Sequence, residues 1–137
     1  MTPNHAAALL YVGICGLFLI VLSVHVSRLR QHHRVLLGTK GNPEMERAQR
    51  AQANFVEYAP LFLLALAGLA YANESAYVIH ILAVLFLLGR VIHAWAMLQA
   101  DTSVHHKGRV VSMTLTWPIL AVASVWVIVD AVTGHAI

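Results

Sequence analysis

Residues 46–60 read ERAQRAQANFVEYAP, and the apolar run LFLLALAGLA follows at residues 61–70. An apolar run of this kind is typical of a membrane-spanning helix, which needs roughly 20 mainly apolar residues. A charged side chain at the bilayer centre costs about 2.5 to 3.5 kcal/mol on insertion scales, so polar residues within a span normally face protein or water. The stretch therefore predicts a membrane helix with a polar face that needs partners.

The composition of the whole chain indicates the same class of protein. Of its 137 residues, 59% are hydrophobic and 11% are charged, whereas about a quarter of the residues of a soluble domain are charged. Because only helices satisfy their own backbone within lipid, the long apolar runs predict an all-α membrane protein. We expect residues 1–137 to form one domain, a four-helix up-down bundle whose spans cover about residues 6–30, 47–72, 76–98 and 109–132.

Lysine and arginine are unevenly distributed between the ends of these spans. Most of them lie between the first two spans or at their edges, and Lys107 and Arg109 lie between the last two. The second connection and both termini carry none. The positive-inside rule then predicts that the first and third loops are cytoplasmic and that both termini are outside. This orientation accounts for the net charge of +3, and without a basic patch interleaved with aromatics we expect no nucleic-acid partner.

Four polar residues share one face of the second span. At 100° per residue, Arg47, Arg50, Asn54 and Glu57 fall within an arc of about 80°. Two interpretations stay open at this point. The face is either a structural network, in which Arg50 pairs with Glu57 or with a neighbouring subunit, or one wall of a ligand site.

The other spans place polar residues at a similar depth. Arg90 and His93 lie about 12 Å and 8 Å from the cytoplasmic end of the third span, at 1.5 Å of rise per residue. Arg28 closes the first span, and we expect Arg109 to open the fourth at a helix N-terminus, where the backbone N–H groups also favour negative charge. The excess of arginine predicts a cationic pocket, open to the cytoplasm, for an anionic water-soluble ligand.

Two features of the sequence have simpler interpretations. Lys107 and Arg109 could do no more than extend to the lipid headgroups. The histidine pairs at residues 32–33 and 105–106 lack a cysteine or carboxylate at ligand spacing, so we predict no metal site.

Three motifs together resemble the MAPEG family, the membrane-associated proteins in eicosanoid and glutathione metabolism. They are ERxxRAxxNxxExxP at residues 46–60, GRVxH at residues 89–93 and RLR at residues 28–30. The resemblance covers nearly the whole chain and is greatest to the small bacterial members, which are similar to microsomal glutathione transferases. It implies a homotrimer in the bacterial inner membrane, with glutathione as co-substrate and membrane lipids as surroundings.

The resemblance also implies an activity and a set of site residues. The activity would be that of a glutathione transferase or peroxidase acting on lipophilic electrophiles or hydroperoxides. Glutathione would bind between subunits at the cytoplasmic end, with Arg109 as the catalytic residue that stabilises the thiolate. The residues expected to bind glutathione are Arg28, Arg50, Asn54, Glu57, Arg90 and His93.

The chain also departs from the pattern of some eukaryotic relatives. Ala53 stands where they have a further arginine, and Met97 and Met113 stand where they have tyrosines. These differences leave open a second hypothesis, a membrane protein that binds glutathione or another anion without turnover. A small cation-efflux transporter is disfavoured because Glu57 shares its helical face with two arginines.

Overall fold

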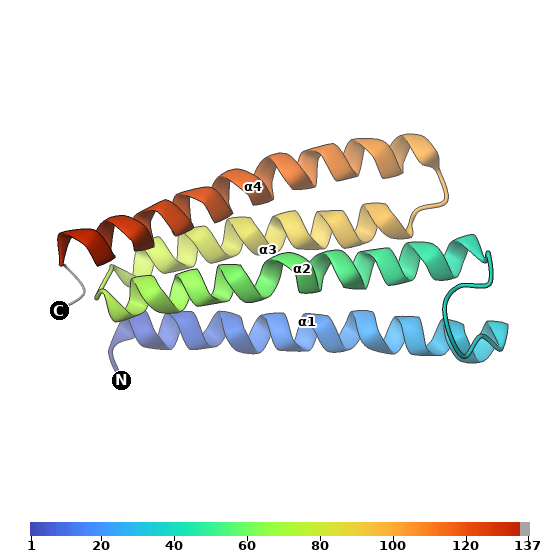
Figure 1. Cartoon of the computed structure of the whole chain (residues 1–137), viewed down its shortest axis with the longest axis horizontal. Coiled ribbons are helices and arrows are strands. Elements are labelled where there is room, and N and C mark those ends of the chain that lie inside the picture. Colours follow the sequence, from blue (N-terminus) through green and yellow to red (C-terminus); the bar gives the residue numbers. More distant parts are fainter. Residues whose placement is uncertain (135–137) are drawn as a thin grey trace.

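The computed structural model describes residues 1–134, which fold into four long helices. They are α1 (Pro3–His33), α2 (Pro43–Tyr71), α3 (Ala76–Leu98) and α4 (Thr102–Thr133). The helices run alternately up and down, with the N-terminus and the end of α4 at one end and the α1–α2 and α3–α4 connections at the other (Figure 1). Each helix is long and apolar enough to cross a membrane. The predicted all-α architecture with four spans is confirmed.

Polar side chains fix where three of the helices begin. The Asn42 side chain accepts hydrogen bonds from the backbone N–H groups of Glu44 and Met45 at 3.0 and 3.1 Å, at the start of α2. Asp101 Oδ1 accepts from the hydroxyl and the backbone N–H of Ser103, both at 2.8 Å. These two bonds hold the pKa of the Asp101 carboxyl below its usual value. Each such cap stabilises a helix by about 1 kcal/mol.

The Asp101 cap corrects the expected start of the fourth helix. Arg109 was expected to open the helix, but α4 begins at Thr102. Arg109 therefore lies about two turns inside the helix, at 3.6 residues per turn. The effect of a helix N-terminus falls off within the first turn. The expectation that the α4 N-terminus assists Arg109 is therefore wrong.

Aromatic and aliphatic side chains of all four helices form the core of the bundle, with the largest buried side chains on α2 and α3. Phe62 and Phe86 stack with their ring centroids 3.9 Å apart, and both are fully buried with Leu66 and Ile79. The outward faces of the helices carry large apolar side chains that are more than half exposed, such as Leu17 on α1. An apolar exterior of this kind is expected where lipid is the solvent. Pro60 and Pro118 lie inside α2 and α4.

Gly89 allows α3 and α4 to approach closely. A Cβ atom at this position would lie 2.8 Å from Thr116 Oγ1 and 3.3 Å from the Ser112 carbonyl oxygen. Both contacts are with α4, and the Ser112 atom belongs to the backbone. The close approach lets the next residue, Arg90, reach side chains of α4.

We expect Gly89→Ala to lower the free energy of unfolding by about 1 to 3 kcal/mol, because the added methyl group overpacks the contact between α3 and α4. Unfolding of the detergent-solubilised protein measures the change. Gly13→Ala is the matched control, since among residues 1–134 a Cβ at that helical position meets nothing within 4 Å besides its own stretch of helix. Equal stability of the two variants would contradict the close packing at Gly89.

Candidate functional site

A polar pocket opens between α2, α3 and α4, near the end of the bundle that carries the α1–α2 and α3–α4 connections. Its volume is about 210 Å³. Five of the seven predicted site residues line it, from three different helices. The lining residues are Arg50, Asn54, Glu57, His93, Met97, Arg109 and Met113.

The α2 wall of this pocket comes from the polar face predicted from the helical period. Arg50 and Glu57 are exposed and Asn54 is half-buried. Within residues 1–134 the structure forms one ion pair, between His33 Nε2 and Glu44 Oε2 at 2.9 Å. Among these residues Arg50 and Glu57 therefore do not form the ion pair that the structural interpretation predicted, while a pair between Arg50 and a neighbouring subunit stays a prediction.

Arg90 was expected to line the pocket, but it lies behind the pocket wall. Its guanidinium is 1% exposed; Nη1 donates to Asn54 Oδ1 at 2.5 Å, and Nη2 donates to the Thr116 hydroxyl. The guanidinium carbon lies 5.0 Å from the centroid of the Tyr58 ring. Arg90 Nε has no hydrogen-bond partner. A buried cation with no carboxylate bonded to it adds positive potential to the pocket.

The His93 ring forms a hydrogen bond with a serine of α4. The ring is 3% exposed, and its Nδ1 lies 2.9 Å from Ser112 Oγ. The Ser112 hydroxyl also lies 2.9 Å from the Arg109 carbonyl oxygen. Thr116 was not predicted as a site residue, and the contact between Ser112 and His93 was not predicted either. The signal for both residues in the sequence is the spacing of two hydroxyl residues four positions apart, which places both on the α3-facing side of α4.

A second chamber adjoins the polar pocket on the side of the helix ends. It has a volume of about 270 Å³ and shares Arg50, Met97 and Arg109 with the polar pocket. Arg47 also lines this chamber, and its Nε is buried without a hydrogen-bond partner among residues 1–134. The remaining lining residues are Pro43, Glu46 and His105. With arginines at 47, 50 and 109, the two chambers form a continuous cationic site.

Arg28, like Arg90, is a predicted site residue that lines neither chamber. It is an exposed residue on α1, and among residues 1–134 helix α1 contacts α2 and α3 but not α4. Because α1 does not contact α4 among these residues, a single chain does not bring Arg28 to the α4 wall of the pocket.

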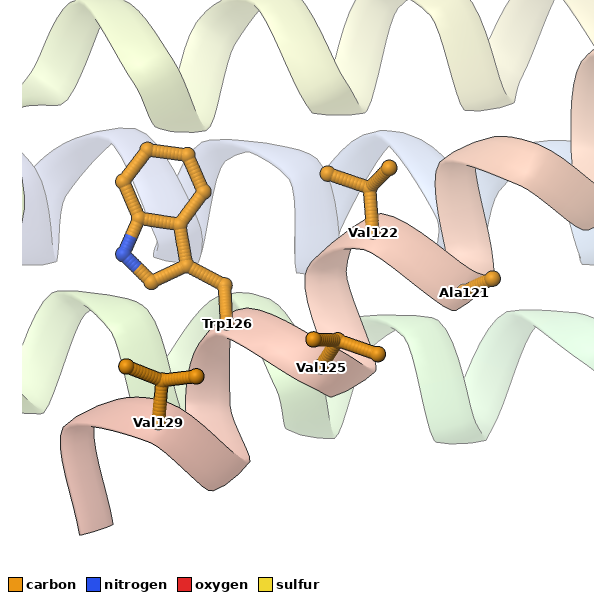
Figure 2. Close-up of a pocket in the computed structure, with 5 residues that line it drawn as sticks. All are labelled: Ala121, Val122, Val125, Trp126 and Val129. Carbon is orange, nitrogen blue, oxygen red and sulfur yellow. The ribbon is translucent and has the colours of Figure 1, made fainter. Parts of the chain in front are cut away.

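Two apolar grooves run along the exposed surface of α4. One has a volume of about 400 Å³, is lined by His106, Val110 and Trp117 among others, and shares Arg109 and Met113 with the polar pocket. The other, of about 520 Å³, lies nearer the C-terminal end of α4 (Figure 2). It is lined by Ala121, Val122, Val125, Trp126 and Val129. The first groove thus joins the cationic site to the lipid-facing surface of α4.

Comparison with known proteins shows which family the chain resembles. The model of the MAPEG family matches residues 8–129. The inner membrane protein YecN of Escherichia coli K12 is 28% identical over 123 residues, which are 85% of this chain and 88% of YecN. The uncharacterized protein sll1147 of Synechocystis is 33% identical over 66% of both chains.

Over a shorter stretch, the chain is also similar to an enzyme. Leukotriene C4 synthase of Cavia porcellus is 44% identical over 77 residues, which are 53% of this chain and 51% of the synthase. No solved structure gives a significant match.

Proposed function

Because the chain belongs to the MAPEG family, we propose that this multi-pass membrane protein is a glutathione-dependent enzyme. It would transfer glutathione to lipophilic electrophiles, or use it to reduce lipophilic hydroperoxides. The observation that carries the proposal is the polar pocket itself, on which Arg50, Asn54, Glu57, His93 and Arg109 converge within an otherwise apolar bundle. Polar groups in a membrane bundle that face a cavity mark a substrate site.

The charges of the two chambers fit glutathione, which carries two carboxylates, one ammonium group and a thiol. Arg47 and Arg50 would hold the carboxylates, since the Arg47 Nε is buried without a partner. Glu57 would hold the ammonium group. Asn54 accepts from Arg90 through Oδ1, so its amide N–H groups remain free to donate to a peptide carbonyl.

Arg109 would stabilise the glutathione thiolate, which is the nucleophile that the bound tripeptide supplies. The groove lined by Val110, Met113 and Trp117 would hold the lipophilic second substrate. Because this groove shares Arg109 with the polar pocket, a substrate arriving from the bilayer along α4 would meet the thiol end of the site.

The placement of Arg28 favours an oligomeric site. Arg28 would reach the pocket from the α1 helix of a neighbouring chain, and we propose the homotrimer that the family resemblance implies. The pocket would open to the cytoplasm, with both termini outside. Native mass spectrometry tests the assembly; a monomer that binds glutathione as tightly as the oligomer would contradict a shared site.

A second function is favoured by Met97 and Met113, which line the pocket where a donor to the thiolate would otherwise stand. A methionine side chain has no hydrogen to donate. The protein would then bind glutathione or a similar anion without turnover. Saturable binding of glutathione, without product from halogenated aromatics or hydroperoxides, would establish this function over the enzyme.

We expect millimolar glutathione to raise the melting temperature of the detergent-solubilised protein, because a ligand that binds only the folded state stabilises it. Arg50→Ala and Glu57→Gln should each weaken binding about tenfold or more, since each removes a charge-assisted hydrogen bond. Glu74→Gln is the control at the other end of the bundle, where the carboxylate accepts from Trp126 Nε1 at 3.1 Å. A shift that is absent in the wild type, or equal in all four proteins, would contradict the proposed site.

A further inference from the structure

The thiol end of the site has few hydrogen-bond donors. Met97 and Met113 line this part of the pocket, and their side chains have no hydrogen to donate in a hydrogen bond. Besides Arg109, His93 is the polar side chain that α3 and α4 contribute to the pocket. The identity of the nitrogen that carries the His93 proton therefore decides what the ring offers to a sulfur atom.

Ser112 is placed to control the proton of His93. Its hydroxyl lies 2.9 Å from His93 Nδ1 and 2.9 Å from the Arg109 carbonyl oxygen. A hydroxyl has one hydrogen and can donate to only one of these acceptors at a time. When Ser112 donates to the Arg109 carbonyl, His93 carries its proton on Nδ1. When Ser112 donates to Nδ1, the proton of the neutral ring lies on Nε2.

The charged groups around His93 favour an anion beside a neutral ring. Arg109 and His105 lie on α4 and Arg90 on α3, while Arg50 and Glu57 face the pocket from α2. The arginines supply the positive charge that an anion requires. A neutral imidazole can add a directed N–H bond to this site without adding another like charge to it.

We propose that His93 donates its Nε2–H to the sulfur of bound glutathione, and that Ser112 holds this tautomer by donating to Nδ1. His93 would thereby supply the hydrogen bond that Met97 and Met113 cannot. His93 contacts the substrate and is a catalytic residue; Ser112 acts through His93 and is a positioning residue. The inference rests on the proposed function and assigns one of its site residues a specific role.

The test follows the ultraviolet absorbance of the thiolate of bound glutathione as a function of pH. In His93→Phe we expect the midpoint of thiolate formation to rise by about one to two pH units, which is roughly a 10- to 100-fold smaller thiolate fraction, because a hydrogen bond to a charged group is lost. His93→Gln keeps a neutral N–H donor and should stay close to the wild type. Ser112→Ala should fall between them.

Two further measurements do not depend on turnover. The ¹⁵N chemical shifts of His93 should report the Nε2–H tautomer when glutathione is bound. The variants should lose less affinity for S-methylglutathione than for the glutathione thiolate, since this analogue has no thiol to ionise. If His93→Phe fails to fold, Ser112→Ala and the tautomer of the wild type carry the test.

The possible outcomes separate the two claims. Failure of the wild type to bind glutathione overturns the proposed function and the inference together. A wild type that binds glutathione and forms the thiolate, but keeps the Nδ1–H tautomer or an unchanged midpoint in His93→Phe, overturns the role of His93 alone.

Discussion

Arg109→Ala will remove most of the thiolate from bound glutathione near neutral pH and will slow glutathione transfer about 100- to 1000-fold, the usual cost of losing one donor to a developing anion. Arg109 is exposed, lines both chambers and the adjoining groove, and contributes its charge without an ion pair to a residue in the described part of the chain. The α4 N-terminus lies about two turns away and cannot replace that charge.

The control for Arg109 is its neighbour Lys107, which is exposed and lines none of the chambers described above. If Arg109 only contacted lipid headgroups, Lys107→Ala and Arg109→Ala would behave alike. We expect Lys107→Ala to retain the thiolate absorbance and the rate, and Arg109→Lys to retain part of both because it keeps the charge. An unchanged thiolate signal in Arg109→Ala would remove Arg109 from the mechanism.

Arg90→Ala will lower the free energy of unfolding by about 2 to 5 kcal/mol, because it leaves a cavity in the core and strands two buried polar groups. Asn54 Oδ1 and the Thr116 hydroxyl lose their partner, and the space over the Tyr58 ring is left unfilled. Unfolding in mixed detergent micelles measures the loss.

The matched variant for Arg90 is Arg50→Ala on the pocket surface. Arg50 is exposed, so its removal should change stability by no more than about 0.5 kcal/mol while weakening glutathione binding. Arg90→Ala should show the opposite balance, with a large loss of stability and a smaller loss of glutathione binding. Equal stability of the two variants would show that Arg90 does not support the pocket wall.

Most of the fold could be predicted because membrane helices are determined by the length of their apolar runs. The first three spans follow from hydropathy. The start of α4 could not be found this way, since residues 102–109 are largely polar and carry no apolar run. The signal there is the Asp101 cap, which resembles an ordinary turn in the sequence.

The site was predictable along each helix but not across helices. The period of 3.6 residues places Arg50, Asn54 and Glu57 on one face, and axial rise gives the depth of His93. Neither gives the rotation of α3 against α4, so the sequence could not show that Arg90 lies behind Asn54. The same rotation, set by the contact at Gly89, brings Ser112 to His93.

A structure of the protein determined with glutathione tests the central claim most directly. We expect density for the tripeptide in the two chambers, with its carboxylates near Arg47 and Arg50, its ammonium group at Glu57 and its sulfur beside Arg109. Empty chambers at saturating glutathione, or density confined to the apolar grooves of α4, would contradict a glutathione site between α2, α3 and α4.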